Sequence, residues 1–174
     1  ATTIHLNNIS SFKENEKYYC RYSKNYFYTG HPFNDIYSEA EIREGMDGES
    51  KYISIGLFPG SRRQEITMLT EIFIKTALML RRIYGDRLRI TLASAHEEYF
   101  DYIIKAKIKI FKKYKIYEDS FFNITNENPS DVIKKSDVLI SASGTVAMEA
   151  LFCRKPVVIC YKVSCLTYFI GRIL

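Results

Sequence analysis

The sequence predicts an α/β protein with a doubly wound, mostly parallel sheet that carries helices on both faces. From residue 51 onward, short apolar stretches alternate with amphipathic helical patterns. The apolar stretches are continuous, as is typical of parallel strands that are buried on both sides. Hydrophobic residues make up 47% of the chain, which is enough to build a core.

The first fifty residues contain fewer regular patterns. Tyr26–Tyr28 is expected to be a short aromatic strand. Gly30 and Pro32 disfavour regular structure on either side of His31. His31 is a candidate cleft residue because it follows a strand, although an ordinary turn histidine would have the same surroundings.

Residues 51–84 predict a strand, a turn and a long helix. Lys51–Phe58 is expected to form the strand, and Pro59-Gly60-Ser61 the turn. Apolar residues then recur every three or four positions, as on the buried face of a helix. They are Ile66, Leu69, Phe73, Ala77, Leu80 and Tyr84.

The start of this helix has an unusual charge. Ser61 and Gln64 fit a capping box with Ser61 at the N-cap. Arg62 and Arg63 then occupy the first helical turn, where positive charge opposes the helix dipole. An anion bound at the turn would offset this conflict; two solvated arginines are the alternative.

The middle of the chain continues the alternation. Arg89–Ala93 and Phe121–Thr125 are expected to be strands, and Asp131–Lys135 a short helix. Tyr99–Tyr114 is expected to be a helix, although alternating Ile and Lys at 103–110 also permit a strand. Its expected apolar stripe is Phe100, Ile104, Ile108 and Phe111. The lysines around the stripe are interpreted as a solvated face, with attraction to a membrane surface as the alternative.

A second strand–turn–helix segment lies at residues 136–150. Val138–Ile140 is expected to be a strand, followed by small residues and by a helix from Thr145. The first amides of a helix have no internal partner and lie at the positive end of its dipole. Gly144 would let a phosphate approach these amides, and Ser143 or Thr145 would cap the helix or donate a hydroxyl.

Glu149 lies four residues after Thr145 and therefore on the same helix face. A carboxylate there can accept two sugar hydroxyls, so the segment favours a nucleotide with its diphosphate at the turn and its ribose at Glu149. An ordinary βα loop is the alternative. Pro156–Tyr161 is expected to be the next strand. Both candidate anion-binding turns follow the carboxyl ends of strands, and in a parallel sheet these ends lie at one edge, where ligands bind.

Composition and residue spacing argue against a nucleic-acid partner, a metal site and a membrane-spanning helix. A net charge of +5 favours anionic ligands or an anionic membrane surface, but it is too small to indicate a nucleic-acid partner. The four cysteines form no C-x-x-C pair and the three histidines are far apart, so no metal site is expected. Apolar stretches stay shorter than the roughly 18 to 20 residues that a membrane-spanning helix needs.

Three stretches in this order resemble those of one enzyme family. They are Y-T-G-H-P-F-N-D (28–35), L-F-P-G-S-R-R-Q-E-I (57–66) and S-D-V-L-I-S-A-S-G-T-V-A-M-E-A (136–150), the last followed by K-P-V-V-I-C-Y-K-V-S-C-L-T-Y (155–168). Together they resemble lipid-A-disaccharide synthase, a bacterial glycosyltransferase of the GT-B fold, over nearly the whole chain. The alternatives are another GT-B enzyme that uses a UDP-sugar, such as a peptidoglycan N-acetylglucosaminyltransferase or a UDP-N-acetylglucosamine epimerase, and a non-catalytic truncated remnant.

The resemblance implies a donor, UDP-2,3-diacylglucosamine, and an acceptor, 2,3-diacylglucosamine 1-phosphate. The residues that would meet the donor diphosphate are Ser61, Arg62, Ser143, Gly144 and Thr145. Glu149 would bind the ribose. Further candidates for the cleft are His31, Gly60 and Arg63. With cations and amides to stabilise the departing UDP, the resemblance implies neither a metal nor a cofactor.

The resemblance also implies a division into domains. Residues 1–35 would be the last elements of the amino-terminal acceptor domain, 36–50 a linker, and 51–174 the nucleotide-sugar-binding domain, truncated at its end. The general base would lie in the amino-terminal domain, so this chain alone is expected to be inactive. The implied location is the bacterial cytoplasm, with peripheral contact at the inner membrane.

Overall fold

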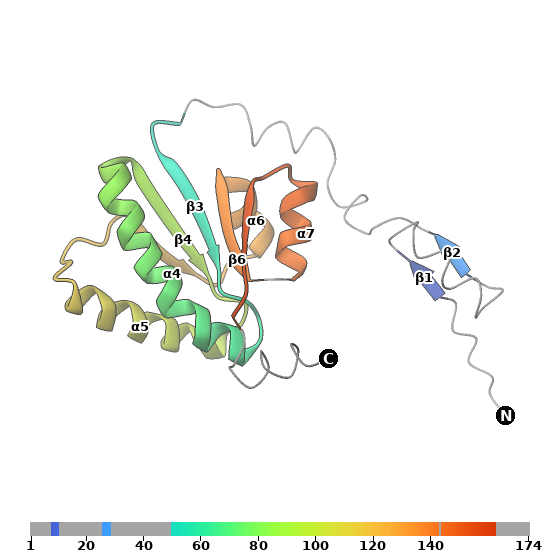
Figure 1. Cartoon of the computed structure of the whole chain (residues 1–174), viewed down its shortest axis with the longest axis horizontal. Coiled ribbons are helices and arrows are strands. Elements are labelled where there is room, and N and C mark those ends of the chain that lie inside the picture. The colour runs from blue at the N-terminus through green and yellow to red at the C-terminus, as the bar shows by residue number, and fades with distance from the viewer. Residues whose placement is uncertain (1–7, 11–25, 29–49, 143, 163–174) are drawn as a thin grey trace, which may run out of the picture. The chain divides into compact units, whose positions relative to one another are not determined.

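Residues 8–10, 26–28, 50–142 and 144–162 are described by the computed structural model of the protein (Figure 1). The chain divides into two units, Ala1–Glu44 and Gly45–Leu174. In the first unit, β1 (Asn8–Ser10) pairs in parallel with β2 (Tyr26–Tyr28), which is the expected aromatic strand.

The second unit is built on a five-stranded sheet in which all neighbouring strands are parallel. The strands are β3 (Ile53–Phe58), β4 (Leu88–Ala93), β5 (Phe122–Thr125), β6 (Val138–Ala142) and β7 (Val157–Cys160). Their order across the sheet is β5-β4-β3-β6-β7. The chain therefore winds outward from β3 in one direction and later crosses back to wind outward in the other.

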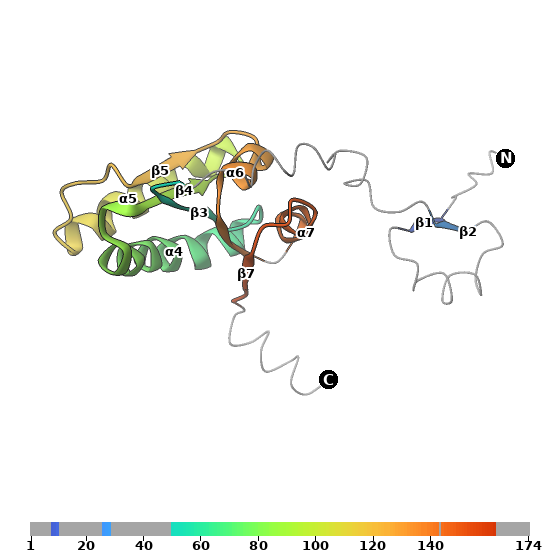
Figure 2. The ribbon, with the colours of Figure 1, turned by 90° about the horizontal axis from the view of Figure 1, so that it is seen from above.

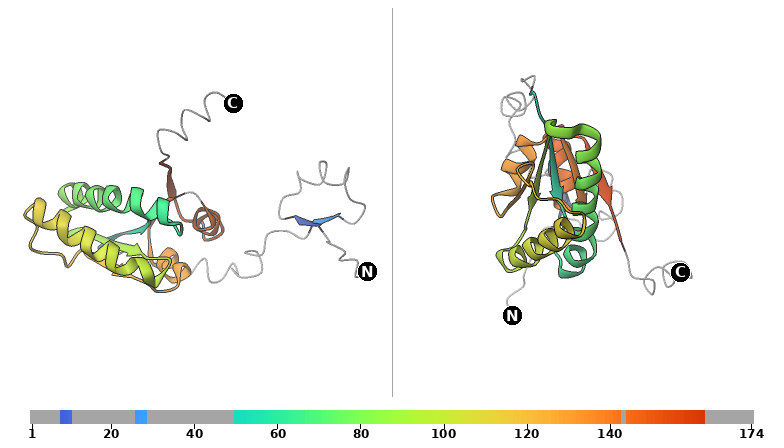
Figure 3. Two further views of the ribbon diagram at one scale, coloured as in Figure 1. Left: turned by 90° about the horizontal axis from the view of Figure 1, so that it is seen from below. Right: turned by 90° about the vertical axis from the view of Figure 1, so that its left-hand side faces the viewer.

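Helices cover both faces of this sheet, as the doubly wound fold class predicts. They are α4 (Arg63–Tyr84), α5 (Phe100–Lys113), α6 (Pro129–Lys135) and α7 (Thr145–Phe152), with short 3₁₀ turns at Gly85–Arg87 (η2) and Glu97–Tyr99 (η3). Figures 2 and 3 show α4 and α5 on one face and α6 and α7 on the other. The change of face occurs between β3 and β6, because β3 leads into α4 and β6 into α7.

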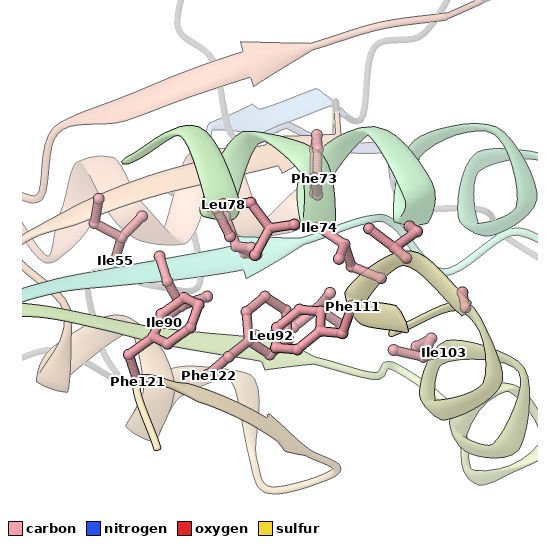
Figure 4. Close-up of a cluster of buried hydrophobic side chains, with 14 of the residues drawn as sticks. Ile55, Phe73, Ile74, Leu78, Ile90, Leu92, Ile103, Phe111, Phe121 and Phe122 are labelled. Carbon is pink, nitrogen blue, oxygen red and sulfur yellow. The ribbon is translucent and has the colours of Figure 1, made fainter. Parts of the chain in front are cut away.

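The main core lies between the sheet and the helices α4 and α5 (Figure 4). Phe73 and Ile74 of α4 are fully buried against Ile90 and Leu92 of β4 and their neighbours. An aromatic cluster closes the far side of this core, where Phe111 stacks on Phe121 at 6.0 Å and meets Phe122 edge-on at 5.7 Å. This apolar layer holds the strands that present the candidate site.

The stripe expected on α4 is confirmed at its start and wrong at its end. Ile66, Leu69, Phe73 and Ala77 are buried, as are the unpredicted Ile74 and Leu78. Leu80 is half-buried and Tyr84 is exposed. The buried face therefore shifts along the helix, and its last turn is largely exposed.

The helix α5 is confirmed, and so is the burial of Phe111, but the rest of its expected stripe is wrong in phase. The buried residues are Ile103, Ala106, Ile110 and Phe111, whereas Ile108 is 60% exposed. Because isoleucine occupies several faces of this helix, its sequence left the direction of burial open. Ile103 and Ile110 face the core, because α5 packs against α4.

Candidate functional site

Two turns meet where the winding of the sheet reverses. β3 and β6 are hydrogen-bonded neighbours with Phe58 opposite Ser141, so the turns that follow them lie at the same edge. In doubly wound sheets, ligands bind in the crevice at this position. A pocket of about 260 Å³ opens there. The residues that line it include Gly60, Ser61, Glu65, Gly144, Thr145 and Glu149.

The first turn leads into α4 one residue later than the sequence indicated. Arg62, and not Ser61, is the N-cap, and the capping box of Ser61 with Gln64 is therefore wrong. Glu65 stands three residues after the cap. Its Oε2 accepts the backbone N–H groups of Ser61 at 3.3 Å and Arg62 at 3.4 Å.

Glu65 thus supplies the negative charge that the first turn of α4 requires. Its Oε1 also lies 3.8 Å from Nη1 of Arg62, whose side chain is 85% exposed. The conflict between the arginines and the helix dipole is offset by a carboxylate of the chain itself. Gly60 permits this arrangement: its φ is +108°, and a Cβ there would lie 2.3 Å from Glu65 Oε2.

The second turn leaves the N-terminus of α7 without a side-chain cap. Gly144 is the N-cap and has no side chain, so Thr145 does not cap the helix as expected. Ser143, the other expected cap, lies outside the described residues. The first turn of α7 contains no acidic residue, in contrast to Glu65 in α4. The positive end of the α7 dipole therefore faces the pocket without a carboxylate in its first turn.

Glu149 lies one turn further along α7 and is only 7% exposed. Its Oε1 accepts a hydrogen bond from the hydroxyl of Ser130, at the start of α6. Sequence reasoning missed Ser130. Asn128 and Pro129 were local signals of a capped helix start, but nothing local indicated that the helix would reach Glu149.

The candidates differ in where the structure places them. Gly60, Ser61, Gly144, Thr145 and Glu149 line one pocket. Arg62 and Arg63 stand at the adjacent start of α4, both exposed and outside the lining. His31 and Ser143 lie outside the described residues.

Comparisons with known proteins identify the family of this chain. A family model described as lipid-A-disaccharide synthetase matches residues 12–174. The chain belongs to this family. It is 33% identical to a lipid-A-disaccharide synthase of Francisella tularensis subsp. tularensis (strain WY96-3418), over 92% of this chain and 42% of that protein. It is 32% identical to the synthase of Francisella tularensis subsp. novicida (strain U112), with the same coverage.

This member of the lipid-A-disaccharide synthetase family therefore spans less than half the length of the curated relatives it matches. In fold it is similar to the crystal structure of Anabaena Alr3699/HepE in complex with UDP and glucose, with a TM-score of 0.50 and 15% sequence identity. That match covers 87% of this chain and 43% of the other. The expected fold class, an α/β GT-B half with a doubly wound, mostly parallel sheet, is confirmed.

The described part of the chain contains neither a cluster of metal-binding side chains nor a helix suited to crossing a membrane. Within residues 50–142 and 144–162 and the two short strands before them, no three histidine, cysteine, aspartate or glutamate side chains gather as metal ligands would. In the same part of this family member, each helix is too short or too polar to cross a bilayer.

Proposed function

We propose that this chain carries the donor site of a lipid-A-disaccharide synthase, with UDP-2,3-diacylglucosamine as donor. The observation that supports the proposal best is the pocket itself. It brings together the turn at Gly60, the turn at Gly144 and the buried carboxylate of Glu149. A diphosphate between the turns and a ribose at Glu149 would match the chemistry of each wall.

The two turns would contribute differently to holding the diphosphate. At α7, the amides after Gly144 and the hydroxyl of Thr145 offer donors to an anion. At α4, an entering phosphate would compete with Glu65 for the amides of Ser61 and Arg62. The Arg62 side chain is exposed, and its Nη1 lies 3.8 Å from Glu65 Oε1. Turning it toward a phosphate would therefore require little free energy.

The proposed reaction is an inverting hexosyl transfer. A hydroxyl of 2,3-diacylglucosamine 1-phosphate would attack the anomeric carbon of the donor and lose its proton to a general base, while the bond to UDP breaks. The products would be lipid A disaccharide 1-phosphate and UDP. Negative charge grows on the departing diphosphate, so Arg62 and the Gly144 turn would stabilise the transition state more than the ground state.

The remaining parts of the reaction belong to a second domain in this proposal. Residues 1–35 would be the last elements of an acceptor domain that holds the general base, 36–50 the linker, and 51–174 the donor domain. Ser143 stays a candidate for binding the donor diphosphate, and His31 a candidate for the cleft. We place the reaction in the bacterial cytoplasm at the face of the inner membrane, because both substrates are acylated.

Calorimetric titration of UDP into the 174-residue chain, with ADP as the control ligand, tests the donor site. We expect saturable binding that prefers UDP. Glu149→Gln should weaken UDP binding by about tenfold, because hydrogen bonds to a charged group contribute roughly 1.5 to 3 kcal/mol. The matched control is Glu127→Gln, which changes an exposed glutamate. If the folded chain binds neither nucleotide, these residues do not form a donor site.

A further inference from the structure

Glu149 is a buried carboxylate that the proposed function assigns to the ribose. A carboxylate has about four lone-pair positions, and both oxygens rotate together about the last side-chain bond. That rotation is broad and roughly two-fold, so it does not by itself direct the lone pairs toward a ligand. Two neighbouring hydroxyls of a ribose need both oxygens in one defined plane. Some other group has to set that plane.

The hydroxyl of Ser130 is a group in position to do so. It donates to Glu149 Oε1, and therefore uses one lone pair of one oxygen. Since a carboxylate has about four lone-pair positions, this bond restrains its plane without using its whole capacity as an acceptor. Glu149 also lines the pocket.

Ser130 is itself held in place by the start of α6. The side chain of Asn128, the N-cap of this helix, accepts the backbone N–H of Ser130 at 3.1 Å. Pro129 between them occupies the first helical turn and lines the same pocket. The hydroxyl of Ser130 is thus presented by a capped helix start and not by a mobile surface side chain.

We propose that Ser130 is a positioning residue for nucleotide recognition: it orients Glu149 so that the site distinguishes a ribose from a 2′-deoxyribose. The proposal rests on the donor site described above. Without the Ser130 hydroxyl, Glu149 would still be present, but its plane would lose the restraint that this hydrogen bond provides. The site would then lose part of its preference for a 2′-hydroxyl, while the diphosphate contacts would be unchanged.

The test measures the affinities of the full 174-residue chain for UDP and for 2′-deoxy-UDP by calorimetry. We expect the unmodified chain to prefer UDP. Ser130→Ala should lower the ratio of the two affinities by about fivefold, the effect of one ordinary hydrogen bond. Ser130→Thr, which keeps the hydroxyl, should restore most of the ratio. In a Glu149→Gln background, Ser130→Ala should have little further effect, because both changes act on one interaction.

Ser136→Ala is the matched control for structural damage. The Ser136 hydroxyl donates to the carbonyl of Val132 at 2.7 Å at the other end of α6. Ser136 is buried, whereas Ser130 is half-buried. This change should lower thermal stability and leave the ratio of affinities as it was. If Ser136→Ala lowers the ratio as much as Ser130→Ala, the effect is structural and the proposal is overturned.

The outcomes for the unmodified chain separate this proposal from the proposed function. If it binds UDP with a preference over 2′-deoxy-UDP, and Ser130→Ala keeps that preference, only the role of Ser130 is overturned. If it binds UDP and 2′-deoxy-UDP equally, ribose recognition at Glu149 is overturned together with Ser130, whereas the diphosphate site stands. If it binds neither, the donor site itself is overturned.

Discussion

Glu65 places a negative charge where the sequence predicted a bound anion. The amides of Ser61 and Arg62 donate to its carboxylate, at the edge of a pocket proposed to hold a diphosphate. The interaction stabilises the start of α4 when the pocket is empty. It also means that a phosphate group arriving at this turn meets a carboxylate with the same charge.

Glu65→Gln tests this competition. Glutamine keeps the shape and an acceptor oxygen but removes the charge, so the chain should lose stability and gain affinity for UDP. Two unit charges about 4 Å apart in a water-like medium repel by about 1 kcal/mol, which corresponds to a roughly fivefold gain. Calorimetry with UDP and thermal unfolding measure both effects.

The matched control for Glu65 is Glu71→Gln, which removes an acid of the same helix that pairs with Lys75 and Lys109 and does not line the pocket. It should leave UDP affinity unchanged. A loss of UDP affinity in Glu65→Gln would show instead that the carboxylate holds the turn in its binding shape.

Local chemistry explains which site residues the sequence could predict. A glycine in a turn or a serine after a strand can be recognised from its neighbours, and so Gly60, Ser61 and Gly144 were identified. The bond from Ser130 to Glu149 joins residues 19 positions apart on two helices. No local pattern encodes that contact, because it depends on how α6 packs against α7.

At the level of elements, α5 shows how charge can tie a helix to the sheet. Lys107 donates to Asp119 at 2.8 Å and to the carbonyl of Phe122 at 3.2 Å. Lys107 lies against the rings of Phe111 and Phe122 and is only 15% exposed, whereas Asp119 is 60% exposed. The Lys107 ammonium holds the pKa of Asp119 below its ordinary value of 3.8. One of the lysines interpreted as a solvated face is therefore a structural contact.

Asp119→Asn should destabilise the chain at neutral pH by less than about 1 kcal/mol, since the carboxylate is largely solvated. A pKa that is lower in the folded chain stabilises it above the ordinary value of 3.8, and this contribution disappears as pH falls through the lowered pKa. The difference between the variant and the unmodified chain should therefore shrink toward about pH 3. Urea unfolding at both pH values measures it.

Glu118→Gln is the neighbouring control for Asp119, because Glu118 accepts a hydrogen bond from Ser120 and makes no contact with α5 among the described salt bridges. An Asp119→Asn effect that persisted undiminished in acid would show that the ion pair is not its cause.

For α5, the sequence predicted the helix but not which of its faces is buried. Amphipathic spacing and helix-forming residues predicted α5 correctly, within one residue at each end. Isoleucine at 103, 104, 108 and 110 offers more than one apolar face, however. Packing against α4 and the aromatic cluster decided between them, and that packing is a tertiary property.

For the molecule as a whole, the distance between β3 and β6 sets the spacing of the two site turns. Gly56 lies opposite Leu139 in this pair. A Cβ at Gly56 would lie 2.7 Å from Ser136 Oγ and 2.8 Å from Leu139 Cδ2. The absence of a side chain therefore permits Ser136, at the end of α6, and the side chain of Leu139 to pack closely over β3. Close packing of this kind was not predictable from the apolar runs.

Gly56→Ala should cost about 1 to 3 kcal/mol of stability, the usual effect of overpacking a core. It should also weaken UDP binding, because the turns after β3 and β6 would move relative to each other. Gly85→Ala provides the contrast: its Cβ would meet no atom within 4 Å, but its φ of +58° strains an alanine at the end of α4. Gly85→Ala should lower stability alone; equal UDP affinity in both variants would contradict the argument.

The contact between Ser54 and Asp137 has a consequence for the order of folding. The Ser54 N–H donates to Asp137 Oδ2 at 2.8 Å, and the Asp137 N–H donates to the Ser54 carbonyl at 2.8 Å. These residues are 83 positions apart, so closing the chain between them costs more entropy than pairing β3 with β4. A chain in which only β3, α4 and β4 have assembled has one of the two turns in place. The pocket therefore requires the pairing of β3 with β6, and recovery of the proposed UDP binding during refolding should not precede that long-range pairing.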